Sequence, residues 1–349
     1  MSSEKAIFHC SLLNNLVMRK FLFFFLVCLV FFSCKFVADK KDSDAVDERI
    51  EIARYDKLLN EYVEFNSFSA LQKMNTEYLL ATKYLIEDVL RLGQVNDDKI
   101  NEKLKVFYSD STLRKLTADA LAKYSNMSWL QKKFTKGFQR LKKEVPSLKI
   151  PHIYSQISAL NESVVVGDSI LGFSIDKYMG EDYPLYKRFF YDYQRKSMKP
   201  ERILPDCFNF YLLSEYPYPE DRGRLIDRML HRGKLEYIVS EILNYKTFGE
   251  ELGYTKEEEE WCEYNRFKIW EYMMQNGHLY STDPMVQRKY LKPAPNTAFF
   301  GDQSPMMVGV WMGMQIVESY MKNHKEATIK DLLEMTDYSK MLAGARFNP

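Results

Sequence analysis

The stretch SVVVGDSILGFSI, Ser163–Ile175, decides the fold class of this 349-residue chain. Two runs of β-branched and apolar residues lie on either side of Gly167-Asp168, a pair that is typical of the turn in a β-hairpin. An earlier run, Ile150–Ser158, has the same character and predicts a further strand. The sequence therefore predicts a small antiparallel sheet in the middle of the chain.

Helices are predicted on both sides of this sheet. Residues 48–150 form a helical region, whose clearest helix begins at the capping box Ser69-Ala-Leu-Gln72 and continues to Leu92 on one apolar face. In the region 151–349 the long helices are expected at Pro200–Glu215, Asp221–Leu243, Lys256–Asn276 and Ser304–Lys322, with a short one after the capping box Thr328–Asp331. The predicted fold class is α+β and predominantly helical, with a helical C-terminal half after the sheet.

The helix Ser304–Lys322 carries a pair of glycines beside its apolar stripe. Gly309 and Gly313 are four positions apart, so they lie in one row on the helix surface. Glycine inside a helix costs about 1 kcal/mol relative to alanine. We therefore expect another element to cross this helix closely at the glycine row.

The N-terminal segment is predicted to be a targeting signal. Phe21–Phe32 is a run of twelve apolar residues, shorter than the roughly 20 that a spanning helix needs. Arg19-Lys20 precede this run and Ser33-Cys34 follow it, which is typical of a bacterial lipoprotein signal. We expect residues 1–33 to be removed, with Met18 as an alternative start, and Cys34 to be the lipid attachment site. An ordinary secretory signal or a short membrane anchor is the alternative interpretation.

The residues after Cys34 differ from the rest of the chain in composition. Residues 34–47 are rich in charged side chains and contain little that could pack, so they predict a flexible tether. The mature chain would keep two further thiols, Cys207 and Cys262. These two either pair in an oxidising periplasm or lie separately as buried small side chains.

The chemistry that the sequence excludes is broader than the chemistry that it predicts. The formal net charge is +1, which gives no field that would favour nucleic acid. No HExxH, GxSxG, CxxC, GxGxxG or phosphate-loop motif is present, so no cofactor and no recognisable catalytic residue is expected. Enzymatic activity stays uncertain on this basis, with a non-enzymatic role preferred.

Three groups of polar residues allow alternative interpretations. Asp227 and His231 are four apart on one predicted helix, with Glu236 downstream, so they could ligate a metal or form a surface ion pair. Carboxylates around Gly180, at Asp176, Glu181 and Asp182, could do acid–base work or simply form a turn. The last group is a basic run on the helix Ser128–Glu144, which is either a solvated face or a contact with lipid headgroups. Its members are Lys132, Lys133, Lys136, Arg140, Lys142 and Lys143.

A series of longer motifs resembles a known family. The motifs are DKYMGEDYPLY (Asp176–Tyr186), YQRKSMKP (Tyr193–Pro200), DRMLHRGK (Asp227–Lys234), WCEYNRFKIW (Trp261–Trp270), YSTDP (Tyr280–Pro284), SPMMVGVWMGMQIVESYM (Ser304–Met321) and TDYSKML (Thr336–Leu342). In order and spacing they resemble the gliding motility lipoprotein GldB family of the Bacteroidetes. The resemblance is dense over Ile170–Pro349 and looser over Ile50–Pro151. It implies a cell-envelope lipoprotein, in the periplasm or at the outer membrane, that is needed for gliding and linked to type IX secretion.

That family is itself similar to predicted zinc peptidases of the gluzincin type. In those proteins a small sheet precedes a helix with HExxH, and a later helix supplies a glutamate. The corresponding helix here, Pro200–Glu215, contains no histidine. The resemblance therefore implies a degenerate peptidase architecture. Two functions remain open: a non-catalytic accessory or scaffold with envelope protein partners, or an atypical metallohydrolase of peptide or peptidoglycan.

Overall fold

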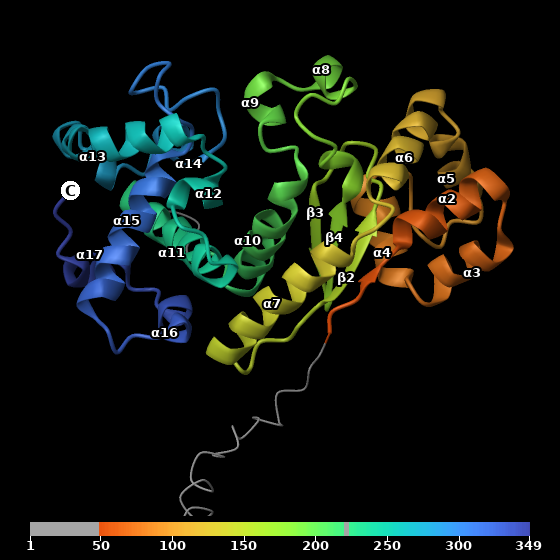
Figure 1. Cartoon of the computed structure of the whole chain (residues 1–349), viewed down its shortest axis with the longest axis horizontal. Coiled ribbons are helices and arrows are strands. Elements are labelled where there is room, and N and C mark those ends of the chain that lie inside the picture. The colour runs from red at the N-terminus through yellow and green to blue at the C-terminus, as the bar shows by residue number, and fades with distance from the viewer. Residues whose placement is uncertain (1–48, 220–222) are drawn as a thin grey trace, which may run out of the picture. The chain divides into compact units, whose positions relative to one another are not determined.

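The computed structural model describes residues 49–219 and 223–349, and residues 49–349 form one compact unit. The predicted signal, the tether and Cys34 lie outside the described residues. Helices and a small sheet make up the unit, so the predicted class, α+β and predominantly helical, is confirmed (Figure 1). Among the described residues, no helix is both long enough and apolar enough to cross a bilayer.

The sheet has four strands within the described residues, and it is mixed rather than antiparallel. The strands are β1 (Ile52–Ala53), β2 (His152–Gln156), β3 (Val164–Gly167) and β4 (Ile170–Ser174), in the order β1-β2-β4-β3. The predicted hairpin is confirmed, because β3 and β4 pair antiparallel. The antiparallel expectation is wrong for the rest, because β1 pairs with β2 and β2 with β4 in parallel.

The loop between β2 and β3 explains this topology. It contains two consecutive residues in the left-handed region, Ala159 and Leu160, with φ of 54° and 64°. The buried carboxylate of Asp176 accepts the backbone N–H groups of Ser158 (2.9 Å) and Leu160 (2.7 Å). The chain is thereby taken to the far edge of the sheet, and the hairpin returns β4 beside β2 in a parallel direction.

The same contacts decide between the two interpretations of the acidic residues near Gly180. Asp176 is fully buried and supports the β2–β3 loop, whereas Glu181 and Asp182 are exposed. These carboxylates therefore do not form one acid–base site, and the turn interpretation holds.

The helices before β2 lie in the region that was predicted to be helical, with two corrections: one predicted helix is broken, and a short strand also lies in this region. They are α2 (Tyr55–Phe65), α3 (Phe68–Thr76), α4 (Leu79–Lys83), the π-helix η2 (Tyr84–Val89), α5 (Ile100–Tyr108), α6 (Ser111–Lys123) and α7 (Ser128–Glu144). The predicted continuous helix from Ser69 to Leu92 is wrong, because it is broken after Thr76 and its cap is Ser67. Strand β1 lies within the region expected to be helical, since two residues are too few to show a period.

The break between α3 and α4 is stabilised by tertiary contacts. The hydroxyl of Thr82 donates to the carbonyl of Met74 at 2.7 Å and accepts from the hydroxyl of Tyr55 at 3.1 Å. All three residues are buried. The periodic apolar face was therefore read correctly as a buried face, but these hydrogen bonds favour two helical segments over one.

The elements after β4 agree closely with the prediction. They are η3 (Ile175–Lys177), α8 (Tyr186–Phe189), α9 (Asp192–Arg195), η4 (Pro200–Arg202), α10 (Ile203–Glu215), α11 (Leu225–Leu243), α12 (Phe248–Leu252), α13 (Lys256–Gln275), η5 (His278–Tyr280), α14 (Pro284–Leu291), α15 (Val308–Asn323), α16 (Ile329–Glu334) and α17 (Tyr338–Ala345). The four predicted long helices correspond to η4–α10, α11, α13 and α15. The capping box that opens α16 is also confirmed, with Thr328 and Asp331 bonded reciprocally.

An aromatic core joins the helices before the sheet to those after it. Phe138 of α7 lies 4.6 Å from Phe208 of α10 between ring centroids, and Phe134 lies 6.0 Å from Phe173 of β4. Packing is therefore continuous across residue 150, the expected boundary between the helical and α+β regions.

The two thiols Cys207 and Cys262 are free, and each is buried separately.

Helices α11 and α15 cross closely at Gly233 and Gly313. Gly313 belongs to the predicted glycine row, so the expected close crossing is present at this position. A Cβ atom on Gly313 would lie 2.8 Å from the carbonyl carbon of Met229 and overlap its oxygen. A Cβ atom on Gly233 would lie 2.7 Å from the backbone nitrogen of Met314. The two backbones are in direct contact, and this crossing places α11 at the centre of the C-terminal half (Figure 1).

Candidate functional site

A pocket of about 930 Å³ opens between α9, α11 and α14. Its described lining includes three cations, Arg228, Arg288 and Lys292, and contains no carboxylate. Partial burial lowers the pKa of Lys292, and the guanidinium groups of Arg232, Arg228 and Arg288 lower it further. The described wall of this pocket is therefore electropositive.

One face of α11 leads from the pocket to a buried polar cluster. Arg228, Arg232 and Glu236 follow one another at four-residue spacing, so they lie on successive turns about 6 Å apart. The guanidinium of Arg232 pairs with the carboxylate of Glu236. Arg232 is partly exposed, whereas Glu236 is buried. Arg232 thus lies between solvent and the buried carboxylate of Glu236.

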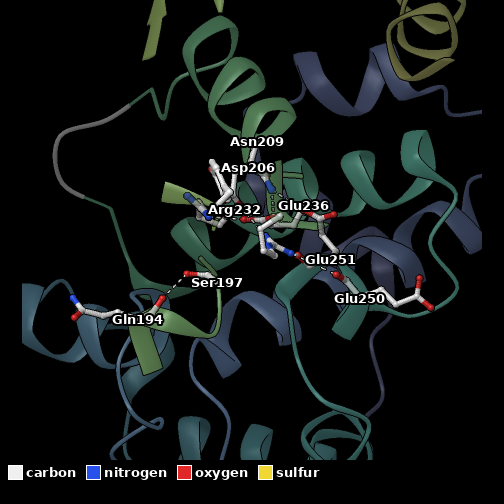
Figure 2. Close-up of polar contacts among 10 residues, drawn as sticks. Gln194, Ser197, Asp206, Asn209, Arg232, Glu236, Glu250 and Glu251 are labelled. Carbon is white, nitrogen blue, oxygen red and sulfur yellow. Dashed lines mark hydrogen bonds and ion pairs between the residues drawn. The ribbon is translucent and has the colours of Figure 1, made fainter. Parts of the chain in front are cut away.

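The centre of the cluster is a pair of buried carboxyl groups, Glu236 of α11 and Glu251 of α12. The amide of Asn209 on α10 donates to both, at 2.5 Å to Glu236 and 2.6 Å to Glu251 (Figure 2). Burial raises the pKa of Glu251 well above its ordinary value, and the neighbouring charge of Glu236 raises it further. Burial and this neighbour therefore favour the neutral, protonated form of Glu251.

A third carboxyl group, that of Asp206, lies on the same side of α10 as Asn209. Its two oxygens accept from the hydroxyl of Tyr178 and from the guanidinium of Arg202, both at 2.9 Å. Arg202 is buried and also donates to the backbone carbonyl of Glu251. Asp206 and Glu236 therefore each have their own guanidinium partner.

This donor set does not fit the zinc that a gluzincin-like architecture implies. Helix α10 presents Asp206 and Asn209 to the cluster where the peptidases would have imidazoles. The carboxylates are held by Arg202 and Arg232, whose positive charges would repel a cation. Among the described residues, no group of His, Cys, Asp and Glu is arranged to bind a metal ion.

The three residues named as metal candidates have separate partners. Asp227 accepts from the side chain and backbone of Arg224 at the start of α11. His231 is buried, and its Nδ1 lies 2.9 Å from the hydroxyl of Tyr338. Glu236 belongs to the carboxyl pair. The structure brings only Glu236 to the cluster, and it also contradicts the alternative of an exposed ion pair between Asp227 and His231.

The environment of His231 keeps its ring neutral. Burial lowers the pKa of His231 to about 3, and the nearby charges of Lys234, Arg232 and Arg228 act in the same direction. A neutral imidazole in this position packs between α11 and Tyr338. His231 therefore contributes to the core of the C-terminal half.

The sequence interpretation missed Arg202, Asn209 and Glu251. The only local signal was the presence of Asp206 and Asn209 in a helix that is otherwise almost entirely apolar. Glu251 lies in the short helix α12 and belongs to no motif. The cluster could have been sought at the polar positions of α10, but its partners could not have been named.

Comparison with known proteins assigns the family. A family model described as gliding motility protein GldB matches residues 37–349. No curated protein and no solved structure matches the chain. The matched range includes the sheet, the pocket and every member of the carboxyl cluster. The chain therefore belongs to the GldB family of gliding motility proteins.

Proposed function

We propose that this protein is a lipid-anchored accessory or scaffold of the gliding motility apparatus and of the associated type IX secretion machinery. Family membership supports the link to gliding. The lipoprotein signal that ends at Cys34 supports a place in the cell envelope, in the periplasm or at the outer membrane. Its partners are then the membrane, through the lipid, and envelope proteins of the apparatus.

The observation that carries the non-catalytic part of this proposal is the pairing within the buried cluster. Asp206 and Glu236 each have a guanidinium partner, and Glu251 is fully buried, which raises its pKa. Groups held in this way stabilise one arrangement of α10, α11 and α12. The adjoining pocket has cations in its wall, so it suits a carboxylate or phosphate group of a bound ligand.

The anchor is tested by labelling cells with a fatty acid. The parent chain should incorporate the label and sediment with membranes, because the thiol of Cys34 carries the acyl group. Cys34→Ala should lose the label and move to the soluble fraction. Unchanged labelling of that variant would refute the lipoprotein assignment.

The pocket is tested by complementation in a gliding bacterium that lacks its own family member. Arg288→Glu combined with Lys292→Glu should abolish the spreading that the parent chain restores, because the wall that attracts an anion is reversed. Lys325→Glu with Lys340→Glu makes the same change of charge at exposed positions outside the pocket and should still restore spreading. Equal spreading of both double variants would refute a role for the pocket.

A hydrolase of peptide or peptidoglycan is the second candidate, and the buried pair of carboxyl groups, Glu236 and Glu251, is the observation that favours it. A neutral and a charged carboxyl group side by side are the components of general acid–base catalysis. Turnover of peptidoglycan by the purified chain, lost in both Glu236→Gln and Glu251→Gln while each variant stays folded, would support this function. Stoichiometric zinc in protein purified without added metal would support the metallohydrolase form of it.

A further inference from the structure

Helix α7 presents a basic face to solvent. Its apolar residues Leu130, Phe134, Phe138 and Leu141 are buried. On the opposite side, six of the helix's exposed residues are Trp129, Lys132, Lys133, Lys136, Arg140 and Lys143. At 3.6 residues per turn, these six side chains fall within an arc of about 100°. The 17-residue helix thus carries a narrow cationic stripe along its whole length of about 25 Å.

The stripe is little compensated by acidic groups. The only acid in Ser128–Glu144 is Glu144, at the C-terminal end. Within the part of the chain that the structure describes, no ion pair involves Lys132, Lys133 or Lys136. The ammonium groups of these three lysines are therefore available to a ligand, whereas Arg140 donates to the backbone carbonyl of Ile242 at 2.6 Å.

An exposed aromatic ring lies at the N-terminal end of the stripe. Trp129 is 38% exposed although it is one of the largest apolar side chains, and the ammonium of Lys133 lies 5.5 Å from its ring centroid. An indole beside lysines is the combination found where proteins meet the headgroup region of a bilayer, because the ring has an apolar body and a polar N–H group. The exposed face of α7 therefore has the composition of a surface that contacts lipid headgroups.

The first described residues of the chain contact helix α7. The backbone N–H of Ile50 donates to the hydroxyl of Thr135, in the middle of α7, at 3.1 Å. Cys34 precedes Ile50 by 16 residues, since 50 − 34 = 16, and such a segment spans at most about 55 Å. A membrane anchor at Cys34 would therefore hold α7 within reach of the same membrane.

We propose that the basic face of α7 lies on the anionic headgroups of the membrane that carries the lipid anchor. The inference rests on the proposed lipoprotein function and adds the contact surface. Lysine and arginine bind the phosphodiester groups, and the acyl chain at Cys34 keeps the local lipid concentration high. In Figure 1, α7 lies at the opposite side of the unit from α8 and α9, and α9 contributes Tyr193 and Gln194 to the wall of the pocket.

Vesicle sedimentation tests the contact without the lipid. The chain 35–349, which retains the whole compact unit, is mixed with phosphatidylethanolamine vesicles that contain about one third phosphatidylglycerol, or with neutral phosphatidylcholine vesicles. We expect binding to the anionic vesicles only, and release when salt is raised from about 0.1 M to about 0.5 M. Equal binding to both vesicles, or to neither, would overturn the proposal.

Charge reversal locates the contact on α7. Lys132→Glu, Lys136→Glu and Lys143→Glu together should weaken binding at least tenfold. The matched control is Lys73→Glu, Lys325→Glu and Lys340→Glu, which changes the net charge equally at exposed positions elsewhere and should weaken binding much less. Both triple variants should melt within a few degrees of the parent, because all six positions are exposed. Equal losses in the two triple variants would show that net charge, and not α7, attracts the vesicles.

The lipid-anchor assignment at Cys34 and the membrane contact of α7 can be refuted independently. If cells acylate Cys34 but the chain 35–349 ignores anionic vesicles, the lipoprotein function stands and the α7 contact is refuted. If the vesicles are bound through α7 but Cys34→Ala keeps its fatty-acid label, the anchor assignment is refuted and the surface stands.

Discussion

Single backbone atoms decide the packing where α11 and α15 cross. Gly313 contacts the carbonyl of Met229, and Gly233 contacts the backbone of Gly313 and Met314. We predict that Gly313→Ala destabilises the protein by about 1–3 kcal/mol, because the added methyl group forces two backbones apart. Urea titration at constant pH measures this change.

For a glycine without such a neighbour, substitution by alanine is expected to change the free energy of unfolding in the opposite direction. In an unhindered helix, the same substitution would stabilise by up to about 1 kcal/mol through helix propensity. Lys322→Ala on the same helix is the control, since its side chain is exposed and should change stability by no more than about 0.5 kcal/mol. A Gly313→Ala protein as stable as the Lys322→Ala protein would refute the close crossing.

The proton on Glu251 makes stability depend on pH. Burial and the charge of Glu236 raise the pKa of Glu251 well above the value of about 4.3 expected in the unfolded chain. Above about pH 4.3 the unfolded chain releases a proton that the folded chain keeps, so this group lowers stability as pH rises toward its folded pKa. Glu251→Gln cannot ionise, so its stability relative to the parent should increase as pH rises from about 4.3 toward the folded pKa of Glu251.

Thermal melts across this pH range, with Glu250→Gln as the matched control, measure the effect. Glu250 is adjacent in sequence but exposed. The difference between variant and parent should grow with pH only for Glu251→Gln. A difference that stays constant would mean that the folded chain does not hold a proton on Glu251.

At the scale of the element, a hydroxyl group decides whether residues 68–89 are one helix or several segments. Thr82→Val removes the bond to Met74 and leaves the buried hydroxyl of Tyr55 without its partner. We predict a loss of about 1–3 kcal/mol in the free energy of unfolding. The control is Thr76→Val, whose hydroxyl bonds the carbonyl of Gln72 at an exposed position. Equal losses for Thr82→Val and Thr76→Val would show that the buried bonds do not stabilise the break.

Helix ends were more predictable than strand pairing. Thr328-Ile-Lys-Asp331 contains both partners of its cap, so the start of α16 could be read locally. The hairpin β3–β4 was also local, because its turn lies between its two strands. The pairing of β2 with β4 joins residues 18 apart across an intervening strand, and only the path of the β2–β3 loop decides it.

At the scale of the whole molecule, the described residues after 48 behave as one packing unit. The rings of Phe134 and Phe138 from α7 contact those of Phe173 and Phe208 from β4 and α10. Strand β1 adds to the edge of the sheet beside β2. We predict that residues 151–349 alone do not fold, because this part would expose the faces that α7 and β1 cover.

Expression of that fragment, followed by circular dichroism and limited proteolysis, tests the prediction. The chain 35–349, which keeps residues 49–150, is the control and should be resistant to protease. A fragment 151–349 that resists proteolysis and unfolds cooperatively would show that the boundary expected near residue 150 separates two independent domains.

The sequence by itself determined the fold class, the long helices of the C-terminal half, the hairpin and the family. These depend on neighbours within a few residues, through helical periodicity, capping boxes and turn residues, or on long motifs in order. The partner of Gly313, the direction of β2 beside β4 and the carboxyl pair were decided only by the tertiary structure. Asn209, Glu236 and Glu251 come from three helices, and no local pattern encodes which polar side chains meet when apolar faces pack.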